Sequence, residues 1–232
     1  MLWKCFFLWG VALLVGARAV QADFCYEQEL YTPASGGQPP RTTRVTGFLS
    51  RSKVRVEDHS SEVPSVIITR LDEGVILVVD PVKKTYVEMP VPGTDEKQPQ
   101  PFPVKVKRTS QVKKIGPYQC TRYEVTTGKS SINVWLSNDL DLTSEEVSTY
   151  WKAGTRLYPV ALTSELAKLP GFPVRVELVY QGATVVTTVT AVAKQEVPAF
   201  LFEVPYGYQR SVAIQAPPEA PPEGGAKPTP PK

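Results

Sequence analysis

Short runs of strand-forming residues, separated by turn residues, follow one another along most of the chain and constrain its fold more than any other feature. In the clearest stretch, Ser65–Leu71 is rich in β-branched residues, and the apolar run Val75–Val79 follows the turn Asp72-Glu73-Gly74. Thr85–Met89 is a third such run after another short turn. Strands joined by short loops predict an antiparallel meander, and an unbroken apolar run is typical of a strand buried on both faces.

The same pattern continues to the C-terminal part of the chain. A second meander lies within 104–136, two long strands within 174–194, and a last short strand at Phe200–Val204. The pattern predicts about eleven strands and two short helices. This favours a mainly β (α+β) fold with a large, strongly curved antiparallel sheet, in a sandwich or half-open β-barrel, over a fold of βαβ units.

The helical signals cluster in the middle of the chain. Thr143, followed by Glu146 three residues later, has the pattern of a capping box at a helix start, and Gly154 is the expected end of that helix. A shorter helix is predicted over Thr163–Leu169, with Pro170-Gly171 as its stop signal.

The first 22 residues, Met1–Ala22, have the pattern of a secretory signal peptide. Lys4 provides the basic start, and the apolar stretch that follows is shorter than the ~20 residues that span a bilayer. Val20-Gln21-Ala22 predicts cleavage before Asp23, and Ala17-Arg18-Ala19 is a second candidate. A retained anchor is the alternative. With cleavage, we expect an exported periplasmic or extracellular protein without a transmembrane span.

The remaining chain divides into one domain and a tail. Residues 23–215 contain all the strand and helix signals and are expected to form a single domain. Residues 216–232 are mostly Pro, Gly, Ala, Glu and Lys, which predicts a disordered Pro-rich tail. Pro90–Pro103 is also proline-rich and is expected to form an exposed loop, because proline lacks the N–H that strand pairing needs.

Two cysteines, Cys25 and Cys120, remain after signal cleavage. In an oxidising compartment they could form one disulfide. The alternative is two separate thiols that pack as small apolar side chains. The sequence leaves both alternatives open, since it does not give the distance between the two Cα atoms.

The net charge argues against a nucleic-acid partner. Loss of Lys4 and Arg18 with the signal peptide lowers the formal charge from +3 to +1. The most basic stretch, Val104–Arg108, alternates valine with lysine. That alternation is typical of the solvated face of a half-buried strand, and its lysines discourage edge-to-edge pairing.

No constellation of catalytic or metal-binding residues emerges from the sequence. The single histidine, His59, lies in a polar stretch, and the Gly-x-Ser-x-Gly pattern of a nucleophile elbow does not occur. One histidine and two cysteines fall short of the four ligands of a structural zinc site. We therefore expect no catalytic residue, metal or cofactor, and a protein that is not an enzyme.

Five aromatic residues lie near the predicted helices. If the sheet curves, the helices could cover its concave side, and these aromatics could line an apolar pocket there. The alternative is that they fill the core. The five residues are Trp135, Tyr150, Trp151, Tyr158 and Phe172.

Several short motifs, taken in order, resemble a known family. They are Ile68–Asp72, Val79–Pro90, Lys113–Tyr123, Val134–Leu136, Leu169–Val174 and Val197–Tyr208. This order resembles a bacterial family of exported domains of unknown function that is similar to the LolA/LolB lipoprotein carriers. The resemblance covers roughly Arg41–Tyr208 and implies a curved antiparallel half-barrel with helices in its mouth.

Two functional hypotheses follow. The first is a non-catalytic periplasmic or envelope protein that binds a lipid, an acyl chain or another hydrophobic ligand in the half-barrel, as the resemblance to LolA-like carriers implies. The second is a structural or partner-binding envelope scaffold with a filled core. The two differ in whether the concave side of the sheet contains a cavity.

Overall fold

The computed structural model describes residues 23–34, 38–92, 103–128, 130–154, 158–180 and 183–211. The predicted signal peptide, most of the proline-rich loop and the Pro-rich tail lie outside these described residues. The domain limits inferred from the sequence therefore remain predictions.

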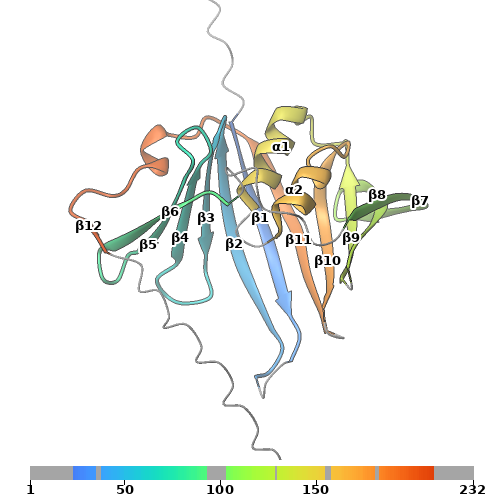
Figure 1. The fold of residues 1–232 in the computed structure, drawn as a ribbon, viewed down its shortest axis with the longest axis horizontal. Coiled ribbons are helices and arrows are strands. Elements are labelled where there is room, and N and C mark those ends of the chain that lie inside the picture. The colour runs from blue at the N-terminus through green and yellow to red at the C-terminus, as the bar shows by residue number, and fades with distance from the viewer. Residues whose placement is uncertain are drawn as a thin grey trace, which may run out of the picture.

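One large sheet dominates the described part of the chain (Figure 1). Its strands are β1 (Asp23–Thr32), β2 (Arg41–Ser50), β3 (Lys53–Asp58), β4 (Ser65–Arg70), β5 (Val75–Asp80), β6 (Thr85–Pro90), β7 (Val104–Ile115), β8 (Tyr118–Thr127), β9 (Ser130–Ser137), β10 (Phe172–Tyr180), β11 (Ala183–Lys194) and β12 (Gln209–Arg210). The helices are α1 (Ser144–Ala153), α2 (Val160–Leu166) and the 3₁₀ helix η2 (Ala199–Phe202).

The sheet is curved and does not close. The order of its described strands is β12-β6-β5-β4-β3-β2-β1-β11-β10-β9-β8-β7, so β12 and β7 form the two edges. Neighbouring strands are antiparallel except for β12, which pairs with β6 in parallel. The fold class predicted from the sequence, a large curved antiparallel sheet with two short helices, is confirmed.

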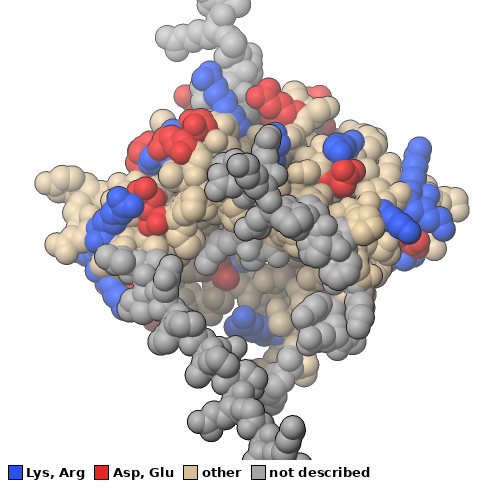
Figure 2. Space-filling view, viewed as in Figure 1, with Lys and Arg blue, Asp and Glu red and all other residues tan. Residues whose placement is uncertain are grey.

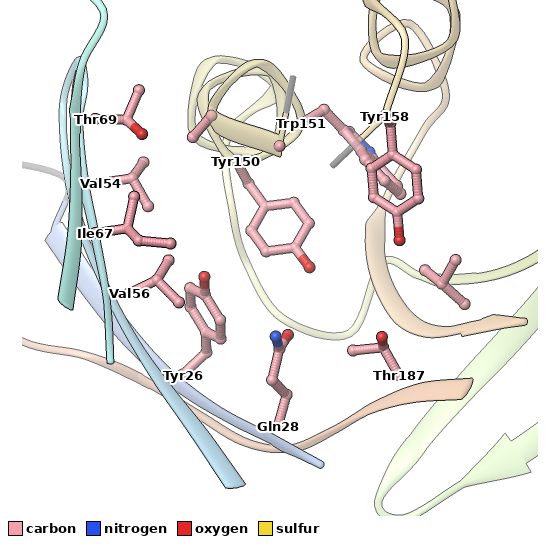
Figure 3. A pocket seen from close by; sticks show the side chains of 13 residues that line it. Tyr26, Gln28, Val54, Val56, Ile67, Thr69, Tyr150, Trp151, Tyr158 and Thr187 are labelled. Carbon is pink, nitrogen blue, oxygen red and sulfur yellow. The ribbon is translucent and has the colours of Figure 1, made fainter. Parts of the chain in front are cut away.

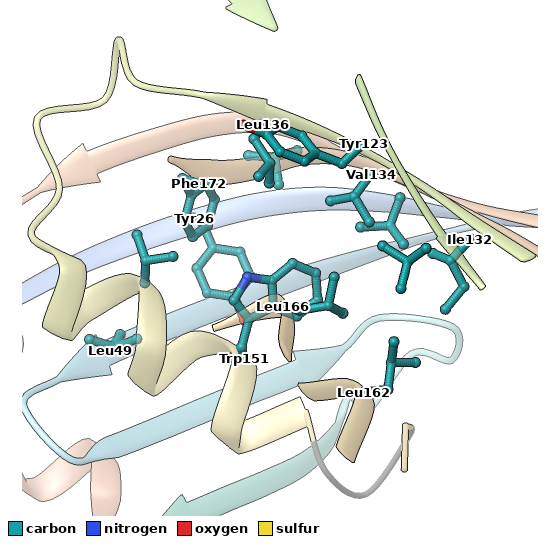
Figure 4. Packing of buried hydrophobic residues seen from close by; sticks show 14 of the residues in the cluster. Tyr26, Leu49, Tyr123, Ile132, Val134, Leu136, Trp151, Leu162, Leu166 and Phe172 are labelled. Atoms are coloured by element: carbon teal, nitrogen blue, oxygen red, sulfur yellow. The ribbon is translucent and has the colours of Figure 1, made fainter. Parts of the chain in front are cut away.

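The concave face of the sheet packs against α1 and α2, which cross in front of its centre in Figure 1. Strand alternation explains this core, because every second residue of β9 faces the helices: Ile132, Val134 and Leu136. From the helix side, Trp151 and Leu166 extend toward the strands (Figure 4). This cluster contains residues of β2 and β3 as well as of β8 and β9, so the helices connect strands from the two sides of β1.

The first helix begins as its capping box predicts. The Glu146 backbone N–H donates to Thr143 Oγ1 at 3.2 Å, and the Thr143 N–H donates to the Glu146 carboxylate. We expect Thr143→Ala to lower the free energy of unfolding by about 1 kcal/mol, measured by urea titration. Ser144→Ala is the matched control at the next residue, and an equal loss in both variants would contradict the capping role.

The second helix is shifted from its predicted position. It spans Val160–Leu166 rather than Thr163–Leu169, and Pro159 is its N-cap residue. The Leu162 and Thr163 N–H groups both donate to the Pro159 carbonyl, so the proline starts the helix rather than interrupting it. The turn at Leu169-Pro170-Gly171 therefore does not end the helix directly, because the last helical residue is Leu166.

The segment Val197–Ser211, here named the C-terminal strap, covers the convex face at β4 and β5 and ends in the edge strand β12. Its Val197 and Phe202 side chains are buried against Val66, Ile68 and Val79 of β4 and β5. The sequence analysis predicted a strand at Phe200–Val204. This prediction is wrong, because Ala199–Phe202 form the 3₁₀ helix η2. Guanidinium groups, rather than a neighbouring strand, bind the Leu201 and Phe202 carbonyls.

The disulfide alternative for Cys25 and Cys120 is also wrong, since both are free thiols in the structure. Cys25 is on β1 and Cys120 on β8, with β11, β10 and β9 between them in the sheet. Neighbouring strands lie about 4.8 Å apart, so the two positions are much farther apart than a disulfide spans. Burial, together with the nearby Asp139 carboxylate, raises the pKa of the Cys120 thiol to about 11.

The basic stretch at Val104–Arg108 belongs to the edge strand β7. Lys105, Lys107 and Arg108 are exposed, as are Lys113 and Lys114 farther along the strand. Lys and Arg side chains gather at the β7–β8 end of the molecule in Figure 2. Exposed lysines on an edge strand hinder pairing with another strand.

Candidate ligand-binding cavity

A cavity of about 140 Å³ lies beneath the C-terminal half of α1, on the concave face of the sheet (Figure 3). Five strands and the helix enclose it, and the segment after the helix adds one side. Its lining consists of Tyr26, Gln28, Val54, Val56, Ile67, Thr69, Tyr150, Trp151, Ala153, Gly154, Tyr158, Val176 and Thr187. Side chains alternate between the two faces of a strand, so the side chains of β3 and β4 that point to the concave face, among them Val54, Val56 and Ile67, line the cavity.

Tyr26 of β1 occupies its position because β2 has a glycine beside it. An ideal Cβ on Gly47 would lie 1.9 Å from Tyr26 Cζ, so a larger side chain cannot share that place with the ring. Tyr26 and Gly47 are direct partners in the β1–β2 register. The missing side chain therefore allows an aromatic ring to lie flat over the sheet next to the cavity.

The ring of Tyr150 is the centre of an aromatic cluster. Its centroid lies 4.9 Å from that of Phe172, 5.4 Å from that of Tyr26 and 5.5 Å from that of Trp151. Tilted and edge-to-face contacts at these distances stabilise beyond the area they bury. The cluster fixes the α1 side of the cavity to the strand side.

The described lining residues include no charged side chain, and they are polar on one side of the cavity. In Figure 3, Val54, Val56 and Ile67 face Gln28 and Thr187 across the cavity. Gln28 Oε1 and Trp151 Nε1 are buried and have no hydrogen-bond partner among the described residues. Such groups favour a ligand that is mainly apolar and carries a neutral hydrogen-bonding group.

The tyrosine hydroxyls of the cavity stay uncharged over the physiological pH range. Burial in an apolar environment disfavours the phenolate, and it raises the pKa of Tyr26, Tyr150 and Tyr158. The neighbouring Tyr26 and Tyr158 raise the pKa of Tyr150 further. The tyrosines of the cavity therefore offer neutral hydroxyl groups.

The structure separates the five aromatic residues named from the sequence. It places Tyr150, Trp151 and Tyr158 in the cavity lining. Phe172 is buried behind Tyr26 and Tyr150 and belongs to the core. Trp135 lies in a separate buried cluster with Cys120 and Val174, because its β9 neighbours Val134 and Leu136 face the helices.

The strand residues of the cavity were missed by the sequence analysis. Val54 and Val56 alternate with charged residues, which indicates a half-buried strand but not which layer covers it. Gln28 and Thr187 are polar residues within strands, and no local pattern marks them as cavity residues. The Tyr26–Gly47 pair could have been suspected only with the register of β1 and β2.

The other chemical features of the described residues lie apart from the cavity. His59 Nε2 contacts Thr46 Oγ1 at 3.1 Å in an exposed position. Within the described ranges, no group of three or more His, Cys, Asp or Glu side chains could hold a metal ion. None of the helices among those residues has the length and apolar character needed to span a bilayer.

The described strands thus form an unclosed, curved antiparallel sheet, a half-barrel, with two helices over the cavity. The chain belongs to the family described as domain of unknown function (DUF4412), which matches residues 37–208. The resemblance to a family of domains of unknown function is thereby confirmed. No curated protein matches the chain.

Several solved structures are similar to the chain. An uncharacterized conserved protein from Thermus thermophilus has a TM-score of 0.52 at 8% identity, with 83% of this chain and 91% of that chain covered. PNGF-II has a TM-score of 0.44 at 13% identity, covering 82% of this chain and 31% of that one. A LolA superfamily protein from Nitrosomonas europaea has a TM-score of 0.37 at 11% identity, covering 79% and 90%.

Proposed function

We propose that this protein is an exported, non-catalytic envelope protein that binds the apolar chain of a lipid or a similar hydrophobic ligand beneath α1. The observation that carries the proposal is the uncharged, largely apolar cavity between the helices and the concave face of the sheet. The predicted signal peptide at Met1–Ala22 supports export. The neutral tyrosine hydroxyls, which offer no nucleophile, support a binding role rather than catalysis.

The size of the cavity sets what it can hold. At about 140 Å³ it is similar to a cavity of about 150 Å³ that accepts benzene in another protein. It therefore has room for the end segment of an acyl chain and not for a whole lipid. Each methylene that leaves water contributes about 0.8 kcal/mol, so affinity should rise with chain length until the cavity is full.

The test combines ligand detection with a variant that fills the cavity. The processed protein, purified from the periplasm of an expression host, is examined by native mass spectrometry before and after organic extraction. We expect an apolar ligand that is lost on extraction, and re-binding of fatty acids with an affinity that increases with chain length.

Val56→Phe should reduce fatty-acid affinity at least tenfold, because the added ring occupies the cavity. Val63→Phe is the matched control, since Val63 is exposed and does not line the cavity. A protein with no ligand and no uptake of fatty acid, or equal binding by both variants, would contradict the proposed function.

A partner-binding scaffold is the second candidate, and the C-terminal strap favours it. Phe200 and Tyr206 are 70% and 106% exposed, although aromatic side chains usually find cover. Photo-crosslinking from these two positions in cells should then trap one defined envelope protein, whereas Val82, which is about as exposed as Phe200, should not. A scaffold would also remain free of ligand in the extraction experiment.

A further inference from the structure

The carboxylate of Asp23 is buried at the start of β1 and is only half satisfied. The residue is 3% exposed, and Asp23 Oδ2 accepts a hydrogen bond from the Val197 N–H at 3.1 Å. Asp23 Oδ1 is buried and has no hydrogen-bond partner among the described residues. The residue's carbonyl oxygen accepts a further bond from the Gln195 N–H at 3.2 Å.

A carboxylate in this position favours a nearby cation. Burying an unpaired charge is costly, and buried acidic residues are nearly always paired. The lysines at neighbouring sheet positions are engaged elsewhere: Lys194 Nζ lies 3.3 Å from Asp141 Oδ2, and Lys53 Nζ lies 3.7 Å from Glu73 Oε1. Among the described residues, no ion pair involves Asp23.

Cleavage at the predicted site would supply such a cation. Val20-Gln21-Ala22 predicts cleavage before Asp23 by a signal peptidase. Water adds across the Ala22–Asp23 peptide bond, so that Ala22 leaves as a carboxylate and the nitrogen of Asp23 becomes an ammonium group. This nitrogen is bonded to the Cα of Asp23 and is therefore within ion-pair reach of its own side chain.

We propose that signal-peptide removal at Asp23 creates an α-ammonium group that pairs with the buried Asp23 carboxylate and thereby locks the C-terminal strap onto the sheet. The inference rests on the export part of the proposed function. The carboxylate holds the first residue of the strap, Val197, whose side chain is buried against the convex face of the sheet. Maturation of one terminus thus stabilises the attachment of the other.

The experiment compares proteins that begin at Asp23 with proteins that begin at Val20, each in the wild-type sequence and in the Asp23→Asn variant. Intact mass of the exported protein identifies its first residue. Recombinant forms that begin at Asp23 or at Val20, the start given by the second candidate cleavage site, are prepared with and without Asp23→Asn. Three extra residues move the ammonium group by up to about 10 Å. All forms are extracted with solvent first, so ligand binding does not affect the comparison.

We expect the exported protein to begin at Asp23 and the Val20 form to melt about 5 °C lower. The Val197 amide should exchange hydrogen about tenfold faster in the Val20 form. Both differences should vanish with Asp23→Asn. If that variant does not fold, acetylation of the α-amino group of the wild-type Asp23 form should reproduce the lower melting temperature.

Other outcomes would overturn the proposed ion pair. Equal melting of the two forms, or a difference that persists with Asp23→Asn or is unaffected by acetylation, would overturn the lock while leaving export intact. A mature chain that begins elsewhere would overturn it as well. An uncleaved exported chain would overturn both the lock and the predicted signal peptide, whereas loss of ligand binding alone would bear only on the cavity.

Discussion

Gly47→Ala should destabilise the protein by about 3 kcal/mol, the upper end of the range for overpacked cores. The new methyl group would lie 1.9 Å from Tyr26 Cζ and 2.2 Å from Cε1, so the ring must move. Tyr26 is 3% exposed and packs against Phe24, Phe172 and Tyr150, which leaves it little room. Thermal unfolding should show a melting temperature lower by roughly 10 °C.

Two comparisons make this prediction specific. Gly154→Ala introduces a methyl group at φ −74°, with its closest neighbour, Tyr158 Cδ2, at an ordinary 3.7 Å, so no loss of stability is expected there. In a Tyr26→Leu background the cost of Gly47→Ala should fall below about 1 kcal/mol, because the ring is gone. A cost that stays the same in both backgrounds would show that the glycine serves another purpose.

Arg70→Met should release the C-terminal strap and lower stability by about 3 kcal/mol. The Arg70 side chain is 13% exposed, and its Nε donates to the Phe202 carbonyl at 2.9 Å. Its two terminal nitrogens bind Glu73, at 3.0 Å, and Glu203. Methionine keeps most of the length of the side chain but leaves that carbonyl without its donor.

Limited proteolysis and hydrogen exchange should locate the effect in Val197–Ser211. Lys53→Met is the matched control, because Lys53 approaches Glu73 and Glu203 at 3.7 and 4.0 Å and is more exposed. Exposed pairs of this kind contribute up to about 1 kcal/mol. Equal effects of the two substitutions would mean that the charges, rather than the hydrogen bond to the strap, hold the segment.

Local patterns predicted the elements of this fold well. The run Val75–Val79 and the capping box at Thr143 specify their structures within a few residues, since β-branching, turn residues and helix caps act locally. The two meanders of the sheet follow for the same reason. The half-open sheet with helices in its mouth was implied by the family resemblance and agrees with the strand count.

Which face of a strand meets which layer could not be predicted from the same patterns. Trp135 and Phe172 were grouped with the cavity residues because they lie near the helices in sequence, yet the sheet places Trp135 on the opposite face. A register irregularity between Pro173 and Arg175 lets Phe172 and Val174 join different clusters although they are two residues apart. The strap was misread because its carbonyls bind distant arginines, Arg55 and Arg70.

The central position of β1 determines the order in which the molecule can assemble. Phe24 pairs with Leu49 on one side and with Lys194 on the other, so the first strand in the chain is completed by the last long one. Such distant pairing requires the closure of a very long loop, and topologies of this kind fold slowly. A chain interrupted during synthesis before β11 can form its meanders but leaves β1 as an open edge. The sheet therefore reaches its native arrangement only once β11 has been synthesised.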